Sequence, residues 1–367
     1  MKRYDYVIIG AGFSGAVLAE RIASQLNKKV LVVDKRNHIG GNCYDYKKHG
    51  IYVQKYGPHI FHTKNKEVFD YLNKFTKFNN YKHKVVAIYK GEYYPIPINL
   101  DTVNKFYGIN LKNGEELKKF LETKRIKVKD IKNSEDVVVS KFGIELYDAF
   151  VKTYTKKCWA KYPSELDKSV LERLPIKYDK DPYYFQDKYQ GMPVKGFGDI
   201  FNKLLSNKNI TLKLNTDFFK HRDEFDFEKM IFTGRLDQFF DFKYGKLDYR
   251  SINYVFKTHN MKSFQPHPVV NFPENNVKYS RITEFKKFHN VKSDKTITCT
   301  EFFTGKGDPT YPIYDKKNLS NLKNYNKEVG KVKNVIFVGR LAEYKYYNMD
   351  SVIEKALEVF NSVLFKT

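Results

Sequence analysis

A short apolar strand that runs directly into three glycines and a helix opens the chain. Residues 6–9 (YVII) lead into Gly10, Gly12 and Gly15 in the arrangement G-x-G-x-x-G, and residues 16–21 continue as a helix. In such a unit the first glycine permits a tight turn, the second lets the backbone approach a pyrophosphate, and the third lets helix and strand pack closely. The helix N-terminus offers unpaired N–H groups to the anion. The pattern predicts a βαβ unit that binds a dinucleotide.

The segment after this unit indicates which dinucleotide is bound. A second apolar strand, residues 30–33, ends at Asp34, where an acidic side chain accepts hydrogen bonds from the adenosine ribose. The paired glycines Gly40 and Gly41 follow, in a segment typical of FAD-binding folds and usually absent from NAD enzymes. The alternative is a turn that is merely glycine-rich, but strand, glycines, helix, strand and acid occur in one run. We therefore expect FAD as the cofactor.

The rest of the chain changes its hydrophobic pattern twice and then returns. Apolar residues recur at helical spacing from about residue 101 to 161, short alternating stretches fill residues 246–303, and residues 334–340 form another apolar strand that stops at glycine. We expect an α/β fold: an FAD-binding Rossmann-like domain with an inserted helical bundle and an antiparallel β-sheet domain. The expected boundaries are 1–78, 193–243 and 321–367 for the discontinuous FAD-binding domain, 99–175 for the helical bundle, and 79–98, 176–192 and 244–320 for the sheet domain.

The net charge of +24 leaves two interpretations open. A basic surface can attract nucleic acid or polyanions, but the lysines are spread along the chain and form no basic tail. We favour a general lysine bias and expect no nucleic acid partner. A non-catalytic nucleic-acid-binding protein remains the alternative from a different class.

Cysteine spacing and hydropathy set further expectations. Cys43, Cys158 and Cys299 form no C-x-x-C pair or zinc-like spacing, which predicts free thiols and no metal site. The start of the chain has no signal-type apolar core, and no apolar run is long enough to span a bilayer. We expect a cytoplasmic protein without a membrane span.

Five further motifs resemble one family. In order and spacing they are similar to bacterial UDP-galactopyranose mutases, and the resemblance covers essentially the whole chain. The motifs are residues 56–63 (YGPHIFHT), 154–159 (YTKKCW), 171–175 (LERLP), 279–284 (YSRITE) and 339–346 (GRLAEYKY). The resemblance implies a homodimer whose active site lies in a cleft between the FAD domain, a helical bundle with a mobile lid loop, and the sheet.

The resemblance also implies roles for single residues. Arg173 and Arg281 would clamp the diphosphate of a UDP-sugar, since planar guanidinium groups bind it bidentately. His59 would lie beside the flavin, and a histidine that only packs in a Gly-Pro turn is the alternative. These three are the expected catalytic residues. The expected substrate-binding residues are His83, Phe150, Tyr154, Thr155, Trp159, Arg173, Tyr184, Asn271, Arg281, Glu301, Tyr311 and Tyr346. The expected cofactor-binding residues are Gly10, Gly12, Phe13, Ser14, Gly15, Asp34, Lys35, Gly41, Asn42, His59, Ile60, Gly339, Arg340, Asn348, Met349, Asp350 and Ser351.

The chain departs from the family pattern at three places. Asn348 stands where the family has an aspartate, and His83 stands where it usually has an asparagine. The stretch between Glu301 and Tyr311 is a few residues short. The first two departures bear on substrate discrimination, and the third leaves both Tyr311 and Tyr314 open as the phosphate-binding tyrosine.

The activity implied by the resemblance is that of an isomerase. It would interconvert UDP-galactopyranose and UDP-galactofuranose through a covalent N5 adduct of reduced FAD, with an external reductant for the flavin and with the N-acetylgalactosamine forms left open as substrates. We find no Ser-His-Asp, paired-carboxylate or metal constellation, which agrees with chemistry carried by a cofactor. The leading alternative is an FAD-dependent oxidoreductase of the amine-oxidase type, which shares the glycine motifs.

Overall fold

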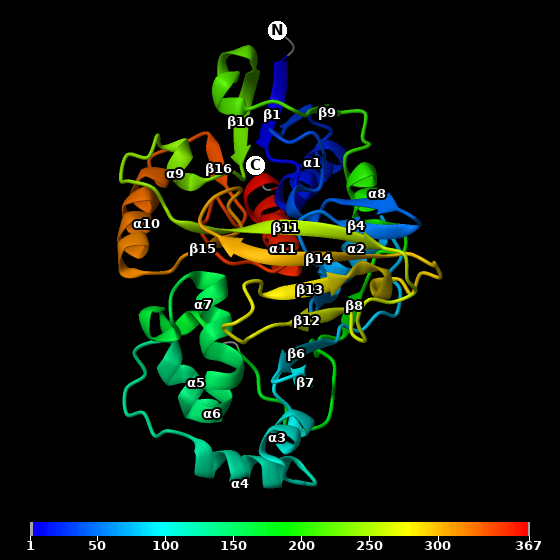
Figure 1. The fold of residues 1–367 in the computed structure, drawn as a ribbon. Helices are drawn as coiled ribbons and strands as arrows, with labels where there is room; N and C mark the ends of the chain where they lie inside the picture. Colours follow the sequence, from blue (N-terminus) through cyan, green and yellow to red (C-terminus); the bar gives the residue numbers. More distant parts are fainter. Residues whose placement is uncertain (1–2, 173, 366–367) are drawn as a thin grey trace.

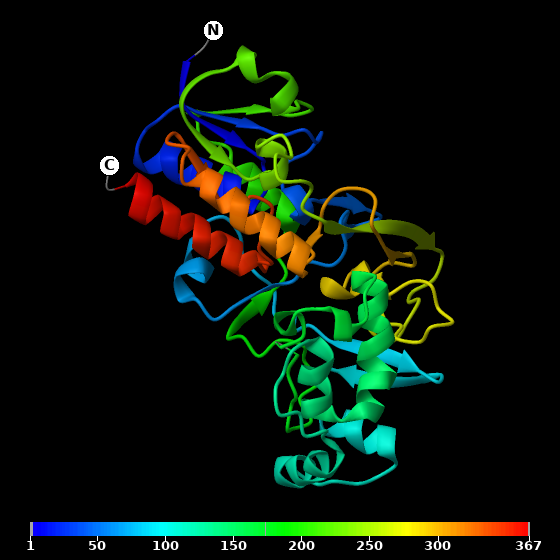
Figure 2. The same ribbon diagram turned by 90° about the vertical axis from the view of Figure 1, so that its left-hand side faces the viewer.

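The chain folds around two β-sheets, and the computed structural model describes residues 3–172 and 174–365. The first sheet lies at one end of the molecule, a helical unit lies at the other end, and the second sheet crosses between them (Figures 1 and 2). Arg173 therefore lies outside the described residues.

The first sheet is wholly parallel and takes strands from almost the full length of the chain. Its order is β16 (Val335–Phe337), β10 (Asp226–Phe232), β1 (Arg3–Ile9), β2 (Val30–Val33) and β9 (Ile210–Lys213). Alternate residues of β1 face opposite layers: Ile8 belongs to the core under the helices, whereas Val7 belongs to a core on the other face. Both faces are covered, as parallel sheets require.

Helices α1 (Phe13–Gln25), α8 (Gly196–Leu204) and α11 (Met349–Val359) pack together on one face of this sheet (Figure 1). Helix α2 (Lys66–Asn73) adjoins α11, and the two-stranded pairs β3–β4 and β5–β8 extend the same region. These strands are Asp45–Lys48, Ile51–Gln54, Phe61–Thr63 and Tyr189–Gly191. The opposite face carries α9 (Leu236–Phe239), α10 (Lys316–Val329) and the short 3-10 turns Phe218–Lys220 and Arg222–Glu224.

The second sheet has seven strands in the order β15, β11, β14, β13, β12, β6 and β7. Their bounds are Tyr311–Pro312, Tyr249–His259, Thr296–Thr304, Arg281–Glu284, Val269–Asn271, Val85–Tyr89 and Glu92–Ile96. Neighbouring strands run antiparallel except β12 and β6, which run parallel. A parallel pair needs a long crossover, and here the helical unit lies in the chain between the two strands.

The helical unit consists of α3 (Leu100–Tyr107), α4 (Gly114–Lys124), α5 (Ser134–Phe142), α6 (Ile144–Leu146) and α7 (Thr153–Trp159). A π-helical turn, Tyr147–Lys152, joins α6 to α7. Asparagine side chains cap α3, α4 and α5 by accepting hydrogen bonds from the first turn, as at Asn99, Asn113 and Asn133. The unit has its own apolar core, which includes Leu117, Leu121, Val138 and Tyr147.

Shorter elements complete the chain. After α7 come the 3-10 turns Pro163–Glu165 and Lys168–Val170, and further 3-10 turns occur at Gly41–Cys43 and Phe285–Phe288. A π-helical turn, Phe360–Leu364, extends α11. No helix among the described residues is both long enough and apolar enough to cross a membrane.

Candidate active site

The three glycines after β1 have the geometry that the sequence predicts. Gly10 has φ +111°, and a Cβ atom built there would lie 2.1 Å from Thr233 Oγ1. A Cβ atom at Gly15 would lie 1.9 Å from the Gly10 carbonyl oxygen, so only glycine allows helix and strand to approach this closely. Gly12 precedes the first residue of α1, and its nearest contact for a Cβ atom is the Gly41 Cα at 3.7 Å. Protein atoms thus fill the space beside Gly10 and Gly15, whereas the space beside Gly12 is left for a ligand.

The paired glycines form the second wall of this cradle. The Gly40 N–H donates to the Ala11 carbonyl (2.8 Å), and Gly41 faces Gly12 so closely that a Cβ atom on it would lie 3.0 Å from the Gly12 Cα. Asp34 accepts hydrogen bonds from the backbone N–H groups of Ala11 (2.8 Å) and Arg36 (2.9 Å). These contacts place the carboxylate at the edge of the glycine turn, where a ribose would be bound.

The C-terminal part of the chain returns to the same cradle. A Cβ atom on Gly339, which has φ +101°, would lie 2.5 Å from Ser14 Oγ, and the Glu343 carboxylate accepts from the Gly339 N–H (2.7 Å). Asn348 directly precedes α11, and its side chain makes no capping hydrogen bond. Met349, Asp350 and Ser351 form the first turn of that helix. A helix N-terminus beside a dinucleotide cradle suits a polar group of the cofactor.

The other expected cofactor residues lie around the same loop in different ways. Phe13 is buried and packs on Phe201 at 4.4 Å between ring centroids, so its backbone is the part that faces the loop. Lys35 is exposed and pairs with Asp308 (3.3 Å). Asn42 accepts from Arg36 (3.0 Å), and Ile60 is buried in the core next to His59.

His59 is held by a fixed set of hydrogen bonds. Gln54 binds both the N–H (2.6 Å) and the carbonyl (2.8 Å) of His59, and the imidazole Nδ1 lies 3.0 Å from the Gly57 carbonyl oxygen. Burial lowers the pKa of His59 to about 4, and the charges of Arg340 and Arg281 act in the same direction. The ring is therefore neutral near pH 7, and because a carbonyl only accepts, Nδ1 carries the proton and Nε2 is an acceptor.

Three of the expected substrate-binding residues form one row across the second sheet. The strand register places Asn271 opposite Arg281, and Arg281 opposite Glu301. Residues directly opposite in neighbouring strands project from the same face of a sheet. The three side chains are therefore neighbours, although the first and the last are 30 positions apart in the sequence. Tyr254 of β11, opposite Glu301, continues the row.

The ion pair in this row is largely buried, with the Arg281 side chain 24% exposed. Arg281 Nε lies 2.8 Å from Glu301 Oε2, and the Glu301 side chain is fully buried. Burial lowers the pKa of Arg281, but Glu301 outweighs it and holds that pKa above its ordinary value. Asn271 Oδ1 and both carboxylate oxygens of Glu301 are buried without an aligned hydrogen bond among the described residues. Such polar atoms fit a site that is completed by a polar ligand.

A group of aromatic rings around Tyr311 lies near this row. Tyr311 contacts Trp159 (6.3 Å between ring centroids), stacks on Tyr346 (5.6 Å) and stacks on Phe303 (6.0 Å). The Arg340 guanidinium lies over the rings of Tyr311 and Tyr346, at 5.6 and 5.2 Å. This arrangement brings together Trp159, Tyr311 and Tyr346, which are expected substrate-binding residues, and Arg340, which is an expected cofactor-binding residue.

Tyr314 has a different position from Tyr311. Its hydroxyl accepts from the Tyr346 N–H (2.7 Å) and donates to the Tyr344 carbonyl (3.3 Å), and its ring packs against the small core around Tyr344. Tyr311 belongs to the aromatic group that contacts Trp159, whereas Tyr314 accepts a hydrogen bond from the backbone of Tyr346.

The remaining expected residues divide into two groups. Tyr154 and His83 interact electrostatically with Arg281, and Tyr184 packs edge-on against His83 (5.9 Å). Phe150 is instead buried between the helical unit and β7, with its ring centroid 5.1 Å from that of Tyr94, and Thr155 is also buried.

Two residues in this region, Arg250 and Lys157, are not among the expected site residues, although Lys157 lies within the motif of residues 154–159. Arg250 of β11 is only 8% exposed and faces Tyr311 across the strand pair, yet it lies in an alternating stretch typical of a surface strand. Lys157 donates to the backbone carbonyls of Phe272 (2.6 Å), Glu274 (2.7 Å) and Tyr279 (3.3 Å). No sequence signal identifies such contacts, because they depend on how distant segments meet.

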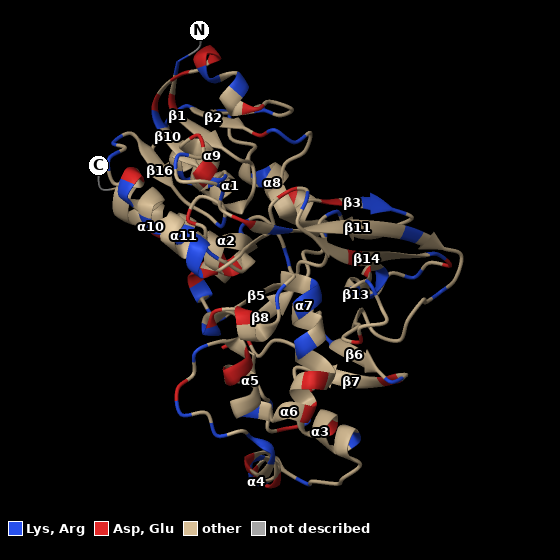
Figure 3. Ribbon diagram, turned by 60° about the vertical axis from the view of Figure 1, so that its left-hand side comes forward, with Lys and Arg blue, Asp and Glu red and all other residues tan. Residues whose placement is uncertain are grey.

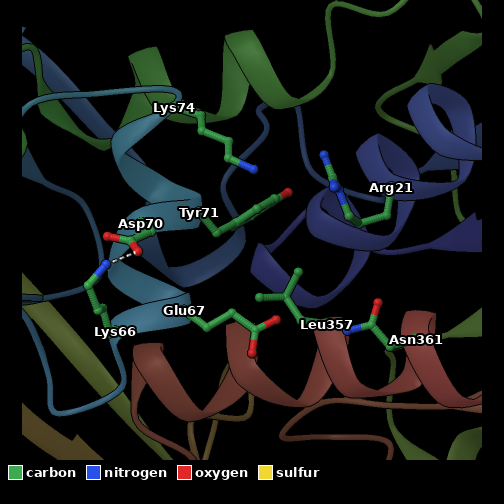
Figure 4. A pocket seen from close by; sticks show the side chains of 8 residues that line it. All are labelled: Arg21, Lys66, Glu67, Asp70, Tyr71, Lys74, Leu357 and Asn361. Atoms are coloured by element: carbon green, nitrogen blue, oxygen red, sulfur yellow. Dashed lines mark hydrogen bonds and ion pairs between the residues drawn. The ribbon is translucent and has the colours of Figure 1, made fainter.

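A separate hollow lies between α1, α2 and α11 (Figure 4). Tyr71 points into it and donates to Glu20 (2.8 Å), which also binds Arg21 through both oxygens. Lys66 pairs with Asp70, so most charges in this hollow already have partners. The predicted site residues lie elsewhere.

Charged side chains are spread over the whole molecule. Lys and Arg occur in all parts of the molecule, mainly on helices and loops, and are interspersed with Asp and Glu (Figure 3). Among residues 3–172 and 174–365, no group of three or more His, Cys, Asp or Glu side chains could hold a metal ion.

Comparisons with known proteins show which family the chain resembles. The family model described as UDP-galactopyranose mutase matches residues 149–346, and a model for an NAD(P)-binding Rossmann-like domain matches residues 8–75. A probable UDP-galactopyranose mutase of Klebsiella pneumoniae is 35% identical over 99% of this chain and 96% of its own length. A dTDP-fucopyranose mutase of Escherichia coli is also 35% identical, over 96% of each chain. A UDP-galactopyranose mutase of Mycoplasma genitalium is 33% identical over 96% of this chain and 93% of its own length.

Solved structures show the same fold. A reduced UDP-galactopyranose mutase matches with a TM-score of 0.79 at 16% identity, covering 100% of this chain and 95% of that chain. A protein described as a putative protoporphyrinogen oxidase from Exiguobacterium matches with a TM-score of 0.69 at 12% identity, covering 100% and 99%. At these identities the likeness concerns the fold.

Proposed function

The chain belongs to the UDP-galactopyranose mutase family, and we propose that it interconverts the pyranose and furanose forms of galactose linked to UDP. The observation that carries this proposal is the row of Asn271, Arg281 and Glu301 beside a dinucleotide cradle and an aromatic group. A diphosphate, a sugar and a base need such neighbours: a guanidinium, polar side chains and flat rings.

The residues of the cradle support FAD as the cofactor. Gly12 leaves space for a pyrophosphate, Asp34 lies at the ribose position, and Gly339 brings the last strand to Ser14. The flavin would lie near His59 and the first turn of α11. When bound and reduced, FAD supplies the electron-rich group that such an isomerisation requires.

Changing the ring size requires the bond between the anomeric carbon and the diphosphate to break and re-form. Negative charge collects on the departing diphosphate, and Arg281 stays cationic there because Glu301 holds its pKa high. Its Nε faces Glu301, so the two terminal amino groups are left to donate to phosphate oxygens. Arg173 remains the proposed second clamp.

The tyrosines and His59 complete the proposed site. Burial raises the pKa of Tyr311 to about 12, so its hydroxyl stays protonated and can donate to a phosphate oxygen. Tyr346 would do the same, while Tyr154 and Trp159 border the base. His59 offers a neutral acceptor, Nε2, which suits a sugar hydroxyl.

The identity of the nucleotide and sugar is a further part of the proposal. Relatives named for UDP-galactopyranose and for dTDP-fucopyranose are equally identical to this chain, at 35%. We propose UDP-galactose as the substrate.

We also propose that the protein is a cytoplasmic homodimer and that an external reductant reduces the flavin. The three-part domain division given above is proposed as well.

Product analysis with reduced enzyme tests the proposal. Dithionite-reduced enzyme should convert UDP-galactofuranose to UDP-galactopyranose without consuming an electron acceptor, and oxidised enzyme should be inactive. Parallel reactions with dTDP-fucofuranose and UDP-N-acetylgalactofuranose would identify the preferred substrate. Turnover that consumes oxygen or another acceptor stoichiometrically would instead establish an oxidoreductase of the amine-oxidase type.

A further inference from the structure

Arg250 is a buried cation that the roles assigned above do not use. It lies on β11, is 8% exposed, and stands opposite Tyr311 in the pairing of β11 with β15. Among the described residues no carboxylate pairs with it, in contrast to Arg281. Burial lowers its pKa. A buried guanidinium without a counter-charge is costly, so its contacts need an explanation.

The side chain of Arg250 contacts the end of α7. The Arg250 Nε–H donates to the Cys158 carbonyl oxygen at 2.9 Å. Cys158 lies in the last turn of α7, where carbonyl groups lack partners within the helix and attract cations. The next residue is Trp159, whose ring contacts Tyr311, and Ala160 then leaves the helix with φ +58°.

Arg250 also contacts the loop that precedes Tyr311 in the chain. The Thr310 N–H donates to the Arg250 carbonyl (2.9 Å), and Arg250 Nη1 is the nearest atom to a Cβ built on Gly305, at 3.8 Å. Arg250 therefore connects the segment that carries Tyr311 with the helix end that carries Trp159.

Two neighbouring lysines hold the same helix end from other directions. Lys157 binds three carbonyls of the loop between β12 and β13, and Lys161 pairs with Asp315 at the start of α10 (3.0 Å). In Figure 1, α7 accordingly ends close to β15 and β13. Of the three cations Arg250, Lys157 and Lys161, Arg250 is the one whose strand pairs with β15, which carries Tyr311.

We propose that Arg250 is a positioning residue of the nucleotide-sugar site: by binding the Cys158 carbonyl, it holds Trp159 against Tyr311 and fixes the point at which α7 ends. The inference rests on the proposed function, since it takes Trp159 as a border of the bound nucleotide. Arg250 acts through Trp159 and needs no contact with the reacting atoms.

The test uses Trp159 as its own reporter, because the chain contains one tryptophan. Arg250→Met should change the emission wavelength or intensity of Trp159 in the FAD-bound enzyme. Lys257→Met is the matched control, since it removes an exposed cation from the same strand and should leave the emission unchanged. Arg250→Gln, which keeps a neutral donor, should give an intermediate change and serves if Arg250→Met does not fold.

Kinetics and a double-mutant cycle complete the test. Losing a charge-assisted hydrogen bond that only positions Trp159 should raise KM about tenfold and leave kcat within about threefold. In a Trp159→Phe background, Arg250→Met should change KM by less than about twofold, because the two residues act as one unit. Additive effects of the two substitutions, or unchanged Trp159 emission in Arg250→Met, would overturn the proposal. A wild-type enzyme without mutase activity would refute the proposed function, while the emission comparison would still test the contact.

Discussion

Arg281 and Glu301 face each other across β13 and β14, with Nε and Oε2 separated by 2.8 Å; Glu301 is fully buried and Arg281 is largely buried. The carboxylate holds the pKa of the guanidinium above its ordinary value and lies at Nε, which is not one of the two terminal amino groups. A pair of this kind is worth more as a ligand-binding device than as a stabilising contact, because desolvation offsets much of its attraction.

Removal of this guanidinium should lower turnover, and it should also destabilise the fold because Glu301 would remain buried without a counter-charge. Arg281→Ala is expected to lower kcat/KM by about 100-fold or more, equivalent to roughly 2.7 kcal/mol, because the charge on the diphosphate grows in the transition state. Arg281→Lys should recover little, since an ammonium cannot reproduce the bidentate fork. Steady-state assays under reducing conditions, with flavin content measured in parallel, provide the comparison. Near-normal kcat/KM in Arg281→Ala would show that the row does not bind the diphosphate.

Cofactor retention should depend on Gly12. Gly12→Val is expected to yield a folded but colourless protein, because the new side chain would occupy the space left for the pyrophosphate. The measurement is the flavin absorbance of the purified variant beside its circular dichroism spectrum. Gly330→Ala, at the end of α10 and with no contact closer than 3.7 Å for the added atom, is the matched control. A yellow Gly12→Val protein would contradict the assignment of the cradle.

His83 should contribute to the loss of stability in acid. Burial, with the charges of Arg281 and His62, lowers the pKa of His83 to about 3, whereas an unfolded chain protonates its histidines near pH 6.5. Between these values the unfolded state binds the extra proton, so stability falls as pH falls from about 6.5 towards 3. His83→Gln should narrow the difference in Tm between pH 7 and pH 4.5 relative to the wild type. An identical difference in both proteins would mean that His83 is not held neutral in the folded state.

Substitutions at Tyr311 and Tyr314 should separate their roles. Tyr311→Phe is expected to lower kcat/KM about tenfold with little change in Tm, since it removes a donor to a charged ligand. Tyr314→Phe should instead lower Tm, because the Tyr346 N–H loses its acceptor at 2.7 Å. Thermal unfolding and steady-state kinetics of both variants give the answer. The opposite pattern would assign phosphate binding to Tyr314.

The sequence predicts the cradle well because its geometry is local. Gly10, Gly12 and Gly15 act through backbone conformation and close approach within a few residues, and such requirements are visible in the residue types themselves. The family and the α/β fold class, predicted from the motifs, are confirmed by the comparisons and by the parallel sheet.

The second sheet was harder to predict in detail. The neighbourhood of Asn271, Arg281 and Glu301 depends on strand register, which hydrophobic alternation indicates only weakly in short strands. Arg250 looks like a surface residue in its strand, but it is buried and donates to the Cys158 carbonyl at the end of α7, a contact between distant segments. The roles proposed for single site residues, including Arg173, stay predictions.

The parallel sheet also has a consequence for how the protein is made. Its edge strand β16 ends at Phe337, and Gly339 reaches Ser14 near the other end of the chain. During synthesis the N-terminal strands can pair early, but β10 keeps an open edge, and the cradle lacks its last wall, until residues 335–339 have been made. Open edges invite pairing with other chains, and contacts between distant segments form slowly. The growing chain is thus more exposed to aggregation than the folded protein, and the cradle becomes complete only when its late segment joins the sheet.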